Sequence, residues 1–247
     1  MRLLIDLDPV DPALGLAIEE VLLDSVRQDG VETIRIWIND HAVVMGRSQS
    51  TAAEVDEAQA CKFGIPVIRR ISGGGTVYHY PGNLNVSVFL RKRHDLSQVS
   101  SVFRFFGLVL VEALSRLVPC LHSEDNGLYI GGLKVGGAAQ AHRGDAILFH
   151  TTLLVRPASV PMEKLLLAMR PGYRPEGIAS RPRTTTSLSE YDARSIDPEE
   201  VVEPIVDALA SALGESLDAG RLTAPEAKRA AELRTDKYGS PMWNRKH

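Results

Sequence analysis

Residues 69–83 read RRISGGGTVYHYPGN and place two arginines, three successive glycines and one histidine within fifteen positions. Because glycine has no Cβ, such a run suits a turn with positive φ or a backbone that lies flat against a ligand. Arg69 and Arg70 could hold an anion that the backbone N–H groups of the turn also face. An ordinary turn between two strands, with the arginines in solvent, explains the same residues, and this stretch alone does not separate the two interpretations.

The residues that follow the glycines predict a strand. From residue 83 to residue 90 the sequence NLNVSVFL alternates apolar with mostly polar residues, which is the period of a strand. A Walker loop is excluded, because Gly75 is followed by Thr76 and Val77 rather than by Gly-Lys-Ser/Thr. A dinucleotide fingerprint is excluded as well, since its glycines open a helix. A phosphate bound here would therefore be held by backbone amides and an arginine.

The composition is that of an ordinary globular protein. The 247 residues suffice for one large domain, or for one domain with a small annex, and 44% of them are hydrophobic. The net charge of −3, from 28 basic and 31 acidic residues, argues against nucleic acid as a partner. The acidic N-terminus argues against a signal peptide, and no apolar run approaches the roughly 20 residues of a membrane span. We expect a cytoplasmic protein without a membrane partner.

Cysteine usage excludes two further classes. Cys61 and Cys120 are the only thiols, and two cysteines make neither a disulfide framework nor a metal cluster. We therefore expect no metal held by a cluster of protein side chains. Cys61, near the end of an expected helix, is interpreted as a small core residue.

A second informative stretch, LYIGGLKVGGAAQ, spans residues 128–140. Gly131 and Gly132 separate two short apolar runs, which predicts a hairpin with a two-residue turn. Because strand side chains alternate between faces, Lys134 points away from its two apolar neighbours. Gly136 and Gly137 leave space beside the lysine. His150 lies in a further strand, 146–155, where a histidine is more often a satisfied core residue than a catalyst.

The order of elements predicts an α+β domain built on mainly antiparallel, mixed sheets flanked by helices. Helices are expected from Pro12 to Gly30 and over 96–118, and two amphipathic helices follow residue 188. Thr51 and Glu54 have the spacing of a capping box for a helix that ends near Gly64, and strands are expected over 31–45 and 66–71.

Taken together, these motifs resemble the lipoate–protein ligase A family, which shares a superfamily with biotin ligases and octanoyltransferases. The resemblance covers nearly the whole chain: DPALGLAIEE at 11–20, VVMGRSQ at 43–49, the two central motifs, RPRTTTSL at 181–188 and KYGSPMWN at 237–244. Two positions depart from the family pattern. Gly15 stands where asparagine is common, and His150-Thr151-Thr152 replaces His-Gly-Thr.

The resemblance implies a biotin/lipoate ligase-type catalytic domain over residues 1–247. In such enzymes lipoate reacts with ATP, accompanied by Mg²⁺, to give lipoyl-AMP, and the lipoyl group then passes to a lysine of an acceptor lipoyl domain. Matching motif to motif implies ATP contacts at Arg70, Gly75, Thr76, Val77, Tyr78 and Lys134. It implies lipoate contacts at Ser72, Gly73, Gly74, His79, Lys134 and Gly137. Lys134 is the expected catalytic residue, because a fixed cation eases the approach of a carboxylate to a phosphate.

Three questions stay open at this stage. A same-fold octanoyltransferase that takes octanoyl from acyl carrier protein would need a nucleophile such as Cys120, and a non-catalytic lipoyl-binding subunit would keep the fold alone. Because KYGSPMWN resembles the end of the catalytic domain, we expect no C-terminal accessory domain after it. Either a separately encoded small protein takes the place of the accessory domain, or the chain is self-sufficient, with Arg183, Thr185 and Thr186 in an adenylate-covering loop.

Overall fold

The computed structural model describes residues 1–93, 95–192 and 195–245. Eight strands form one large mixed sheet in the order β11–β1–β2–β6–β10–β9–β8–β7. Strand β1 pairs in parallel with β2 and β11, and every other neighbouring pair is antiparallel. The strands are β1 (Arg2–Val10), β2 (Thr33–Asn39), β6 (Asn83–Arg91), β7 (Leu121–Glu124), β8 (Gly127–Ile130), β9 (Leu133–Arg143), β10 (Ala146–Leu154) and β11 (Asp218–Ala219). The expected α+β fold with a mainly antiparallel sheet is confirmed.

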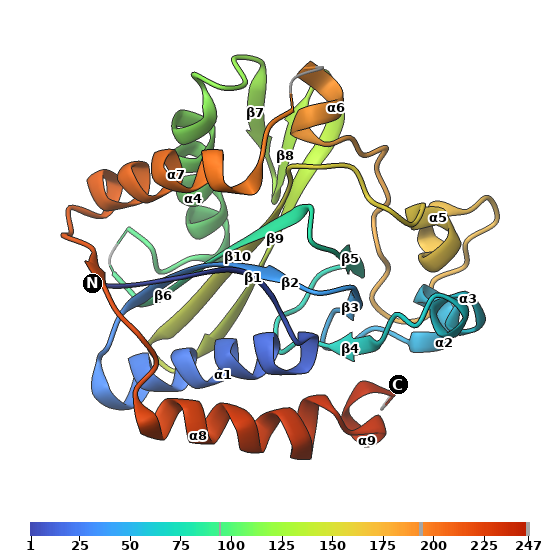
Figure 1. Ribbon diagram of the computed structural model, residues 1–247, viewed down its shortest axis with the longest axis horizontal. Helices are drawn as coiled ribbons and strands as arrows, with labels where there is room; N and C mark the ends of the chain where they lie inside the picture. Colours follow the sequence, from blue (N-terminus) through green and yellow to red (C-terminus); the bar gives the residue numbers. More distant parts are fainter. Residues whose placement is uncertain (94, 193–194, 246–247) are drawn as a thin grey trace.

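A second, three-stranded sheet carries the glycine-rich stretch. It has the order β4–β3–β5, with β3 (Ala42–Met45) in the centre, β4 (Val67–Arg69) and β5 (Val77–His79). Residues 70–76, called the glycine loop below, connect the two outer strands. The expected strand-to-strand connection is therefore present, but the strand that follows the loop is the short β5, which the sequence did not predict, and not the strand expected at 83–90. This sheet lies at one end of the large sheet (Figure 1).

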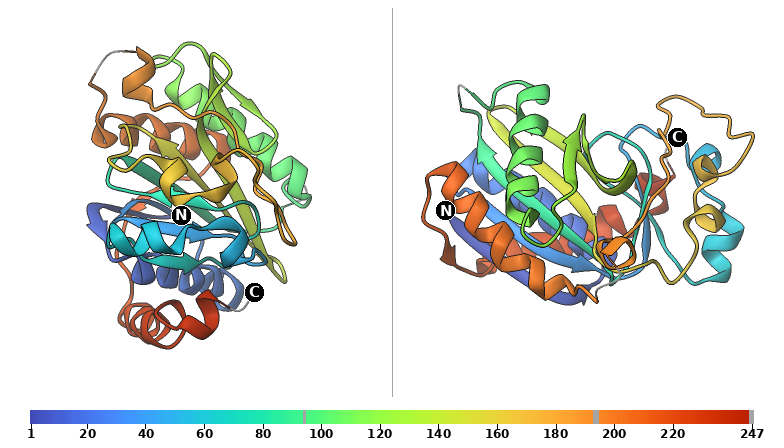
Figure 2. Two further views of the ribbon diagram at one scale, coloured as in Figure 1. Left: turned by 90° about the vertical axis from the view of Figure 1, so that its right-hand side faces the viewer. Right: turned by 90° about the horizontal axis from the view of Figure 1, so that it is seen from above.

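Helices cover both faces of the large sheet. Figure 1 shows α1 (Pro12–Asp29) and α8 (Ala224–Leu233) on one face, and α4 (Val99–Leu114) and α7 (Pro198–Leu213) on the other. The edge-on view in Figure 2 shows the same layers, with α8 outside α1. Each face has its own hydrophobic core, because side chains of every strand alternate between the two faces. The short helical segments are α2 (Thr51–Glu54), α3 (Glu57–Lys62), α5 (Met162–Leu165), η1 (Leu167–Met169), α6 (Leu188–Asp192), the π-helical η2 (Arg234–Tyr238) and α9 (Pro241–Asn244).

Local sequence signals explain where α1 begins and ends. The Asp11 side chain accepts a hydrogen bond from the Leu14 N–H (2.9 Å), and Pro12 occupies the first helical position. Gly30 ends the helix with φ of 71°, a conformation that glycine adopts without strain. This capping fixes the helix that carries Glu19 toward the sheet.

Two sequence expectations are wrong. Thr51 and Glu54 do not form a capping box: α2 is a single turn, and the chain is extended at Val55 before α3 begins. The Thr51 hydroxyl instead donates to the Asn244 carbonyl (3.4 Å), and the Glu54 carboxylate accepts from distant residues described below. Cys61 is exposed and is not a core residue. In both cases tertiary contacts that the local sequence does not encode decide the outcome.

Candidate active site

A pocket of about 580 Å³ lies between the glycine loop, strands β9 and β10, and residues 178–185. Most residues expected at the site line it: Arg70, Gly74, Gly75, Thr76, Val77, Tyr78, His79, Lys134, Gly137, Arg183 and Thr185. Ser72, Gly73 and Thr186 were expected there too but are not among the lining residues. The fold therefore brings both central motifs and the 181–188 motif to one cavity.

Arg69 binds backbone carbonyls around the glycine loop and is not placed to bind an anion in the pocket. Its buried guanidinium donates to three carbonyls of the 46–49 turn, at 2.7 to 3.3 Å. It also donates to the carbonyls of Trp243 (3.2 Å) and Asn244 (2.9 Å) near the C-terminus. Arg69 thus joins the start of the glycine loop to two distant segments, and it does not line the pocket.

Arg70 holds the glycine loop from inside. It donates to the Ser72 hydroxyl (2.9 Å) and to the carbonyls of Val44 (3.1 Å), Gly73 (2.6 Å) and Gly75 (2.8 Å). Burial lowers the pKa of Arg70 to about 10, so the guanidinium stays charged at neutral pH. Because a guanidinium has five N–H groups, one remains for a ligand in the pocket that Arg70 lines.

Gly74 in the glycine loop and Gly46 in the neighbouring turn each require glycine, for different reasons. Gly74 has φ of +86°, which side chains rarely tolerate. Gly46 in the neighbouring turn has no room for a Cβ, because such an atom would lie 2.0 Å from the Gly74 carbonyl oxygen. The VVMGRSQ motif and the glycine loop are therefore packed backbone to backbone.

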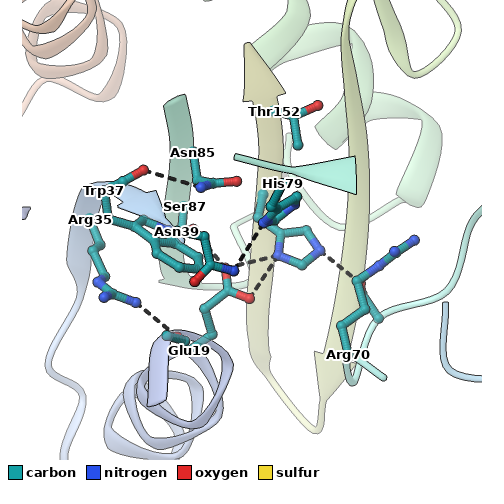
Figure 3. Close-up of polar contacts among 12 residues, drawn as sticks. Glu19, Arg35, Trp37, Asn39, Arg70, His79, Asn85, Ser87 and Thr152 are labelled. Atoms are coloured by element: carbon teal, nitrogen blue, oxygen red, sulfur yellow. Dashed lines mark hydrogen bonds and ion pairs between the residues drawn. The ribbon is translucent and has the colours of Figure 1, made fainter. Parts of the chain in front are cut away.

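A buried carboxylate and one histidine form a polar network beside the loop. Figure 3 shows Glu19 projecting from α1 toward the strands that carry Trp37 and Ser87. The Glu19 carboxylate accepts from the Ser87 hydroxyl (2.7 Å) and contacts His150 Nδ1 (2.8 Å). Burial alone would raise the pKa of Glu19, but His150, the Ser87 hydroxyl and the nearby Arg35 charge lower it. Glu19 is therefore an anion that orients the His150 ring.

The other nitrogen of His150 reaches the glycine loop. His150 Nε2 lies 2.7 Å from the Ser72 hydroxyl, which already accepts from Arg70. The hydroxyl hydrogen is then free for Nε2, and this assigns the proton of a neutral ring to Nδ1, facing Glu19. Both ring nitrogens of His150 have partners, as expected for a histidine in a strand. His150 also lines the pocket.

His79 is a neutral member of the same wall. Its Nδ1 lies 3.2 Å from the Asn39 amide nitrogen (Figure 3). Burial, together with the charge of Arg70, lowers the pKa of His79 to about 3. The ring therefore contributes a polar but uncharged surface to the pocket throughout the neutral range.

Lys134 supplies a positive charge to the pocket that the glycine loop also lines. It follows the Gly131-Gly132 turn at the start of β9, as expected from the hairpin. Burial and the charge of Arg183 lower the pKa of the Lys134 ammonium. No hydrogen bond or ion pair to Nζ occurs within residues 1–93, 95–192 and 195–245. A Cβ on Gly137 would lie 3.2 Å from Nζ, so the glycine leaves room for an unpaired cation that faces the pocket.

Both departures from the family pattern have structural counterparts. A Cβ on Gly15 would lie 2.5 Å from a ring carbon of Trp37, which lines the pocket, so this ring position requires glycine. In the second pattern the residue that replaces glycine is Thr151, which is buried and whose hydroxyl donates to the Thr152 carbonyl (3.2 Å).

Sequence reasoning missed several residues of this wall, namely Glu19, Trp37, Asn85 and Arg181. Glu19 carried a usable signal, since it is a charged residue on the apolar face of α1. The other three lie on strands or loops whose orientation depends on tertiary packing.

Three observations concern the exposure of Cys120, metal binding and membrane-spanning helices. Cys120 is exposed in the turn before β7 and does not line the pocket. Among the described residues there is no group of three or more His, Cys, Asp or Glu side chains placed to hold a metal ion. In the same part of the chain, no helix has the length and apolar character needed to cross a membrane.

Comparison with known proteins gives a consistent result. Residues 11–210 match the family model described as the lipoyl protein ligase A/B catalytic domain. Lipoate-protein ligase A subunit 1 of Thermoplasma acidophilum is 28% identical over 256 aligned positions, which cover 98% of this chain and 95% of that protein.

Two solved structures are similar over nearly their full length. A Thermoplasma acidophilum protein with bound lipoic acid has a TM-score of 0.83 and 26% identity, covering 98% of both chains. A lipoate-protein ligase A bound with ATP has a TM-score of 0.79 and 27% identity, covering 98% of this chain and 97% of that one.

Proposed function

The chain belongs to the lipoyl protein ligase A/B catalytic domain family, and on that premise we propose that it is an ATP-dependent lipoate–protein ligase. The observation that carries the proposal is the unpaired Lys134 ammonium, which lines the same pocket as the glycine loop. Solved structures of similar chains hold lipoic acid in one case and ATP in another, which supports both substrates.

In the first half-reaction, a carboxylate oxygen of lipoate attacks the α-phosphorus of ATP. The new bond is the mixed anhydride of lipoyl-AMP, and the bond to the β-phosphate breaks to release pyrophosphate. Both reactants are anions, so a fixed positive charge at the meeting point lowers the barrier. Lys134 supplies that charge, and the remaining N–H of Arg70 adds a second donor in the same pocket.

In the second half-reaction, the amine of an acceptor lysine attacks the acyl carbonyl of lipoyl-AMP. A C–N amide bond forms, the C–O bond to AMP breaks, and the amine loses its proton to solvent. The Lys134 ammonium would polarise the carbonyl and stabilise the departing phosphate. No residue of the enzyme becomes acylated in this scheme.

Divalent cations enter this scheme only as part of the nucleotide substrate. Glu19 is the carboxylate of the pocket wall, and its oxygens already contact Ser87 and His150. Mg²⁺ prefers phosphate oxygens and water, so we propose that it arrives chelated by ATP.

Activation by the chain alone is the arrangement we propose. Arg181 and Arg183 line the same pocket as Lys134, which supplies cations for a nucleotide phosphate without a further protein. The name "subunit 1" of the Thermoplasma relative favours the alternative, in which a second protein completes the activation site.

Lipoate-dependent exchange of pyrophosphate into ATP tests this function. We expect exchange with the wild-type chain and a loss of about 100-fold or more in Lys134→Ala, because one electrostatic donor of this kind contributes that much. Lys228→Ala, which changes an exposed lysine of α8, serves as the matched control and should exchange normally. Absence of exchange with the wild type would overturn activation by the chain alone, and normal exchange in Lys134→Ala would overturn the role of the lysine.

A further inference from the structure

Residues 173–186, called the strap below, run along the pocket and are fixed at both ends. At the C-terminal end, the Lys134 N–H donates to the Thr184 carbonyl (2.8 Å) and the Thr186 N–H donates to the Lys134 carbonyl (3.0 Å). Between the ends, Arg181 and Arg183 line the pocket. The other part of the strap is held by hydrogen bonds to the side chains of Gln49 and Glu54, which are distant in the sequence.

Ser180 is the centre of that second anchor. Its hydroxyl accepts from the Thr76 N–H of the glycine loop (2.9 Å) and from the Gln49 side-chain amide (3.0 Å). It donates to the Glu54 carboxylate at 2.5 Å. All three hydrogen-bonding positions of the hydroxyl are filled. Ser180 therefore joins three segments that meet at the pocket wall.

Gln49 reinforces the same junction and is fully buried. Its oxygen accepts from the Gly46 N–H (3.0 Å) and the Thr76 hydroxyl (2.8 Å), and its nitrogen donates to the Ile178 carbonyl (3.2 Å) as well as to Ser180. The amide thereby holds the glycine loop and the strap at a set separation.

Glu54 is a carboxylate that the proposed chemistry leaves unused. It is fully buried, and no ion pair to it occurs among the described residues. It accepts from the Tyr173 hydroxyl, from the Ser180 N–H (3.3 Å) and from the Ser180 hydroxyl. Burying a carboxylate without a cation is costly, so donors must satisfy it, and all three donors belong to the strap.

The third glycine of the glycine loop fits this junction. A Cβ on Gly75 would lie 3.0 Å from the Ser180 hydroxyl oxygen and 3.3 Å from the Ser180 Cα. The strap and the glycine loop are therefore in contact at the point where the hydroxyl engages Thr76. A side chain at residue 75 would push them apart.

We propose that Glu54 and Ser180 are positioning residues for the nucleotide half of the pocket. They act through the Thr76 N–H on one side and through Arg181 and Arg183 on the other. Glu54 does not line the pocket, and the hydroxyl of Ser180, which does line it, already has three protein partners. Leu16, Trp37 and Asn85 line another part of the pocket, to which we assign the acyl chain, and that part has no hydrogen bond to this junction among the described residues. The assignment to the nucleotide rests on the proposed function.

The anchor itself is tested without any substrate, in Ser180→Ala and Glu54→Gln. Hydrogen exchange of the unliganded variants should be faster than wild type in peptides covering 73–77 and 173–183, and unchanged in α4. Tyr191→Phe removes an exposed tyrosine hydroxyl outside the strap and is the matched control for loss of a hydroxyl. Unchanged exchange in both variants would overturn the anchor.

The role in nucleotide binding is tested by comparing affinities. We expect the affinity for lipoate to stay within about two-fold of wild type in both variants. The affinities for ATP and lipoyl-AMP should fall about ten-fold or more, because a hydrogen bond to a charged group contributes that much. A general loosening of the fold would instead weaken lipoate and nucleotide equally, and that result would overturn the proposal. If the wild type binds neither nucleotide, the proposed function fails, while the exchange experiment still reports on the anchor.

Discussion

Arg69 and Arg70 show how one residue type can serve two purposes that a sequence does not separate. A guanidinium beside three glycines suits an anion, and it equally suits a ring of backbone carbonyls. Here the carbonyls come from residues 44–49, 73–75 and 243–244, and two of these segments are distant in the chain. Lys134 is the opposite case. Gly136 and Gly137 predicted free space beside its side chain, and that space is present at Gly137, whereas Gly136 faces the Thr152 carbonyl and Leu128 instead.

Substitution of the two neighbouring glycines by alanine separates an effect on Lys134 from an effect on the backbone. In Gly137→Ala the new Cβ would lie 3.2 Å from Lys134 Nζ, the flexible end of a side chain. We expect a normal melting temperature and a 10- to 100-fold loss of lipoyl-AMP formation, since misplacing a reacting group by about 1 Å costs that much.

In Gly136→Ala the new Cβ would lie 2.5 Å from the Thr152 carbonyl oxygen of the neighbouring strand. The backbone must shift, and overpacking of this kind costs about 1–3 kcal/mol of unfolding free energy. Calorimetry and pyrophosphate exchange on both variants check the pair. An unstable Gly137→Ala with normal activity would contradict this account of the lysine.

Among the elements, the C-terminal segment of η2 and α9 explains the KYGSPMWN motif. The Asn244 side-chain oxygen accepts from the Arg69 N–H (2.9 Å), and its nitrogen donates to the Tyr238 carbonyl (2.8 Å). The Trp243 indole N–H donates to the Arg69 carbonyl (2.8 Å). The motif therefore supports the strand that leads into the glycine loop, although it contributes no residue to the pocket wall. Lys246 and His247, which follow the motif, lie outside the described residues.

Asn244→Ala tests this support. It leaves the Arg69 N–H and the Tyr238 carbonyl without their partners, so we expect a loss of about 2 kcal/mol of unfolding free energy. We also expect weaker ATP binding, because Arg69 is the residue of β4 that directly precedes the glycine loop. Met242→Ala is the neighbouring control, since Met242 is 85% exposed. Denaturant titration and ATP titration check both variants. Equal unfolding free energies and equal ATP affinities in the two variants would show that Asn244 does not support the glycine loop.

Elements with strong local signals were predictable from sequence. The bounds of α1, the Gly131-Gly132 hairpin and the strand β6 are confirmed because neighbouring residues determine them, whereas the three-residue β5 directly after the glycine loop was not predicted. The Thr51–Glu54 pattern failed because its side chains bond to residues 244 and 180, which no local pattern reveals. The site followed the same rule: the motif residues were predicted, whereas Trp37 and Arg181 reach the pocket only through tertiary packing.

At the scale of the whole molecule, Glu226 joins both ends of the chain. Its carboxylate receives both terminal nitrogens of Arg2 in β1, at 2.8 and 2.7 Å, and the Ser25 hydroxyl of α1 (2.7 Å). It also closes the capping box with Thr223 at the start of α8. These contacts outweigh the effect of burial and hold the pKa of Glu226 at about 2.

Glu226 should therefore make stability depend on pH. A carboxylate whose pKa is lower in the folded state stabilises the fold above its ordinary pKa of 4.5, and this contribution is lost as pH falls toward 2. We expect Glu226→Gln to lower the unfolding free energy by about 1–3 kcal/mol at pH 7, with the difference from wild type shrinking between pH 4.5 and 2.

Glu232→Gln is the control for Glu226→Gln, because it breaks only an exposed pair with Arg229. Urea titrations from pH 7 to pH 2.5 measure both. A difference between wild type and Glu226→Gln that grows as the pH falls would show that the sign of this argument is wrong.

The most direct test of the central claim is transfer of an acyl group to a purified lipoyl domain, followed by intact mass spectrometry. The donors are lipoyl-AMP and octanoyl-acyl carrier protein, and the proteins are wild type, Lys134→Ala and Cys120→Ser. We expect wild type and Cys120→Ser to modify one lysine of the domain from lipoyl-AMP, and Lys134→Ala to leave the domain unmodified. Transfer from octanoyl-acyl carrier protein alone, with an acyl thioester trapped on Cys120, would contradict the account.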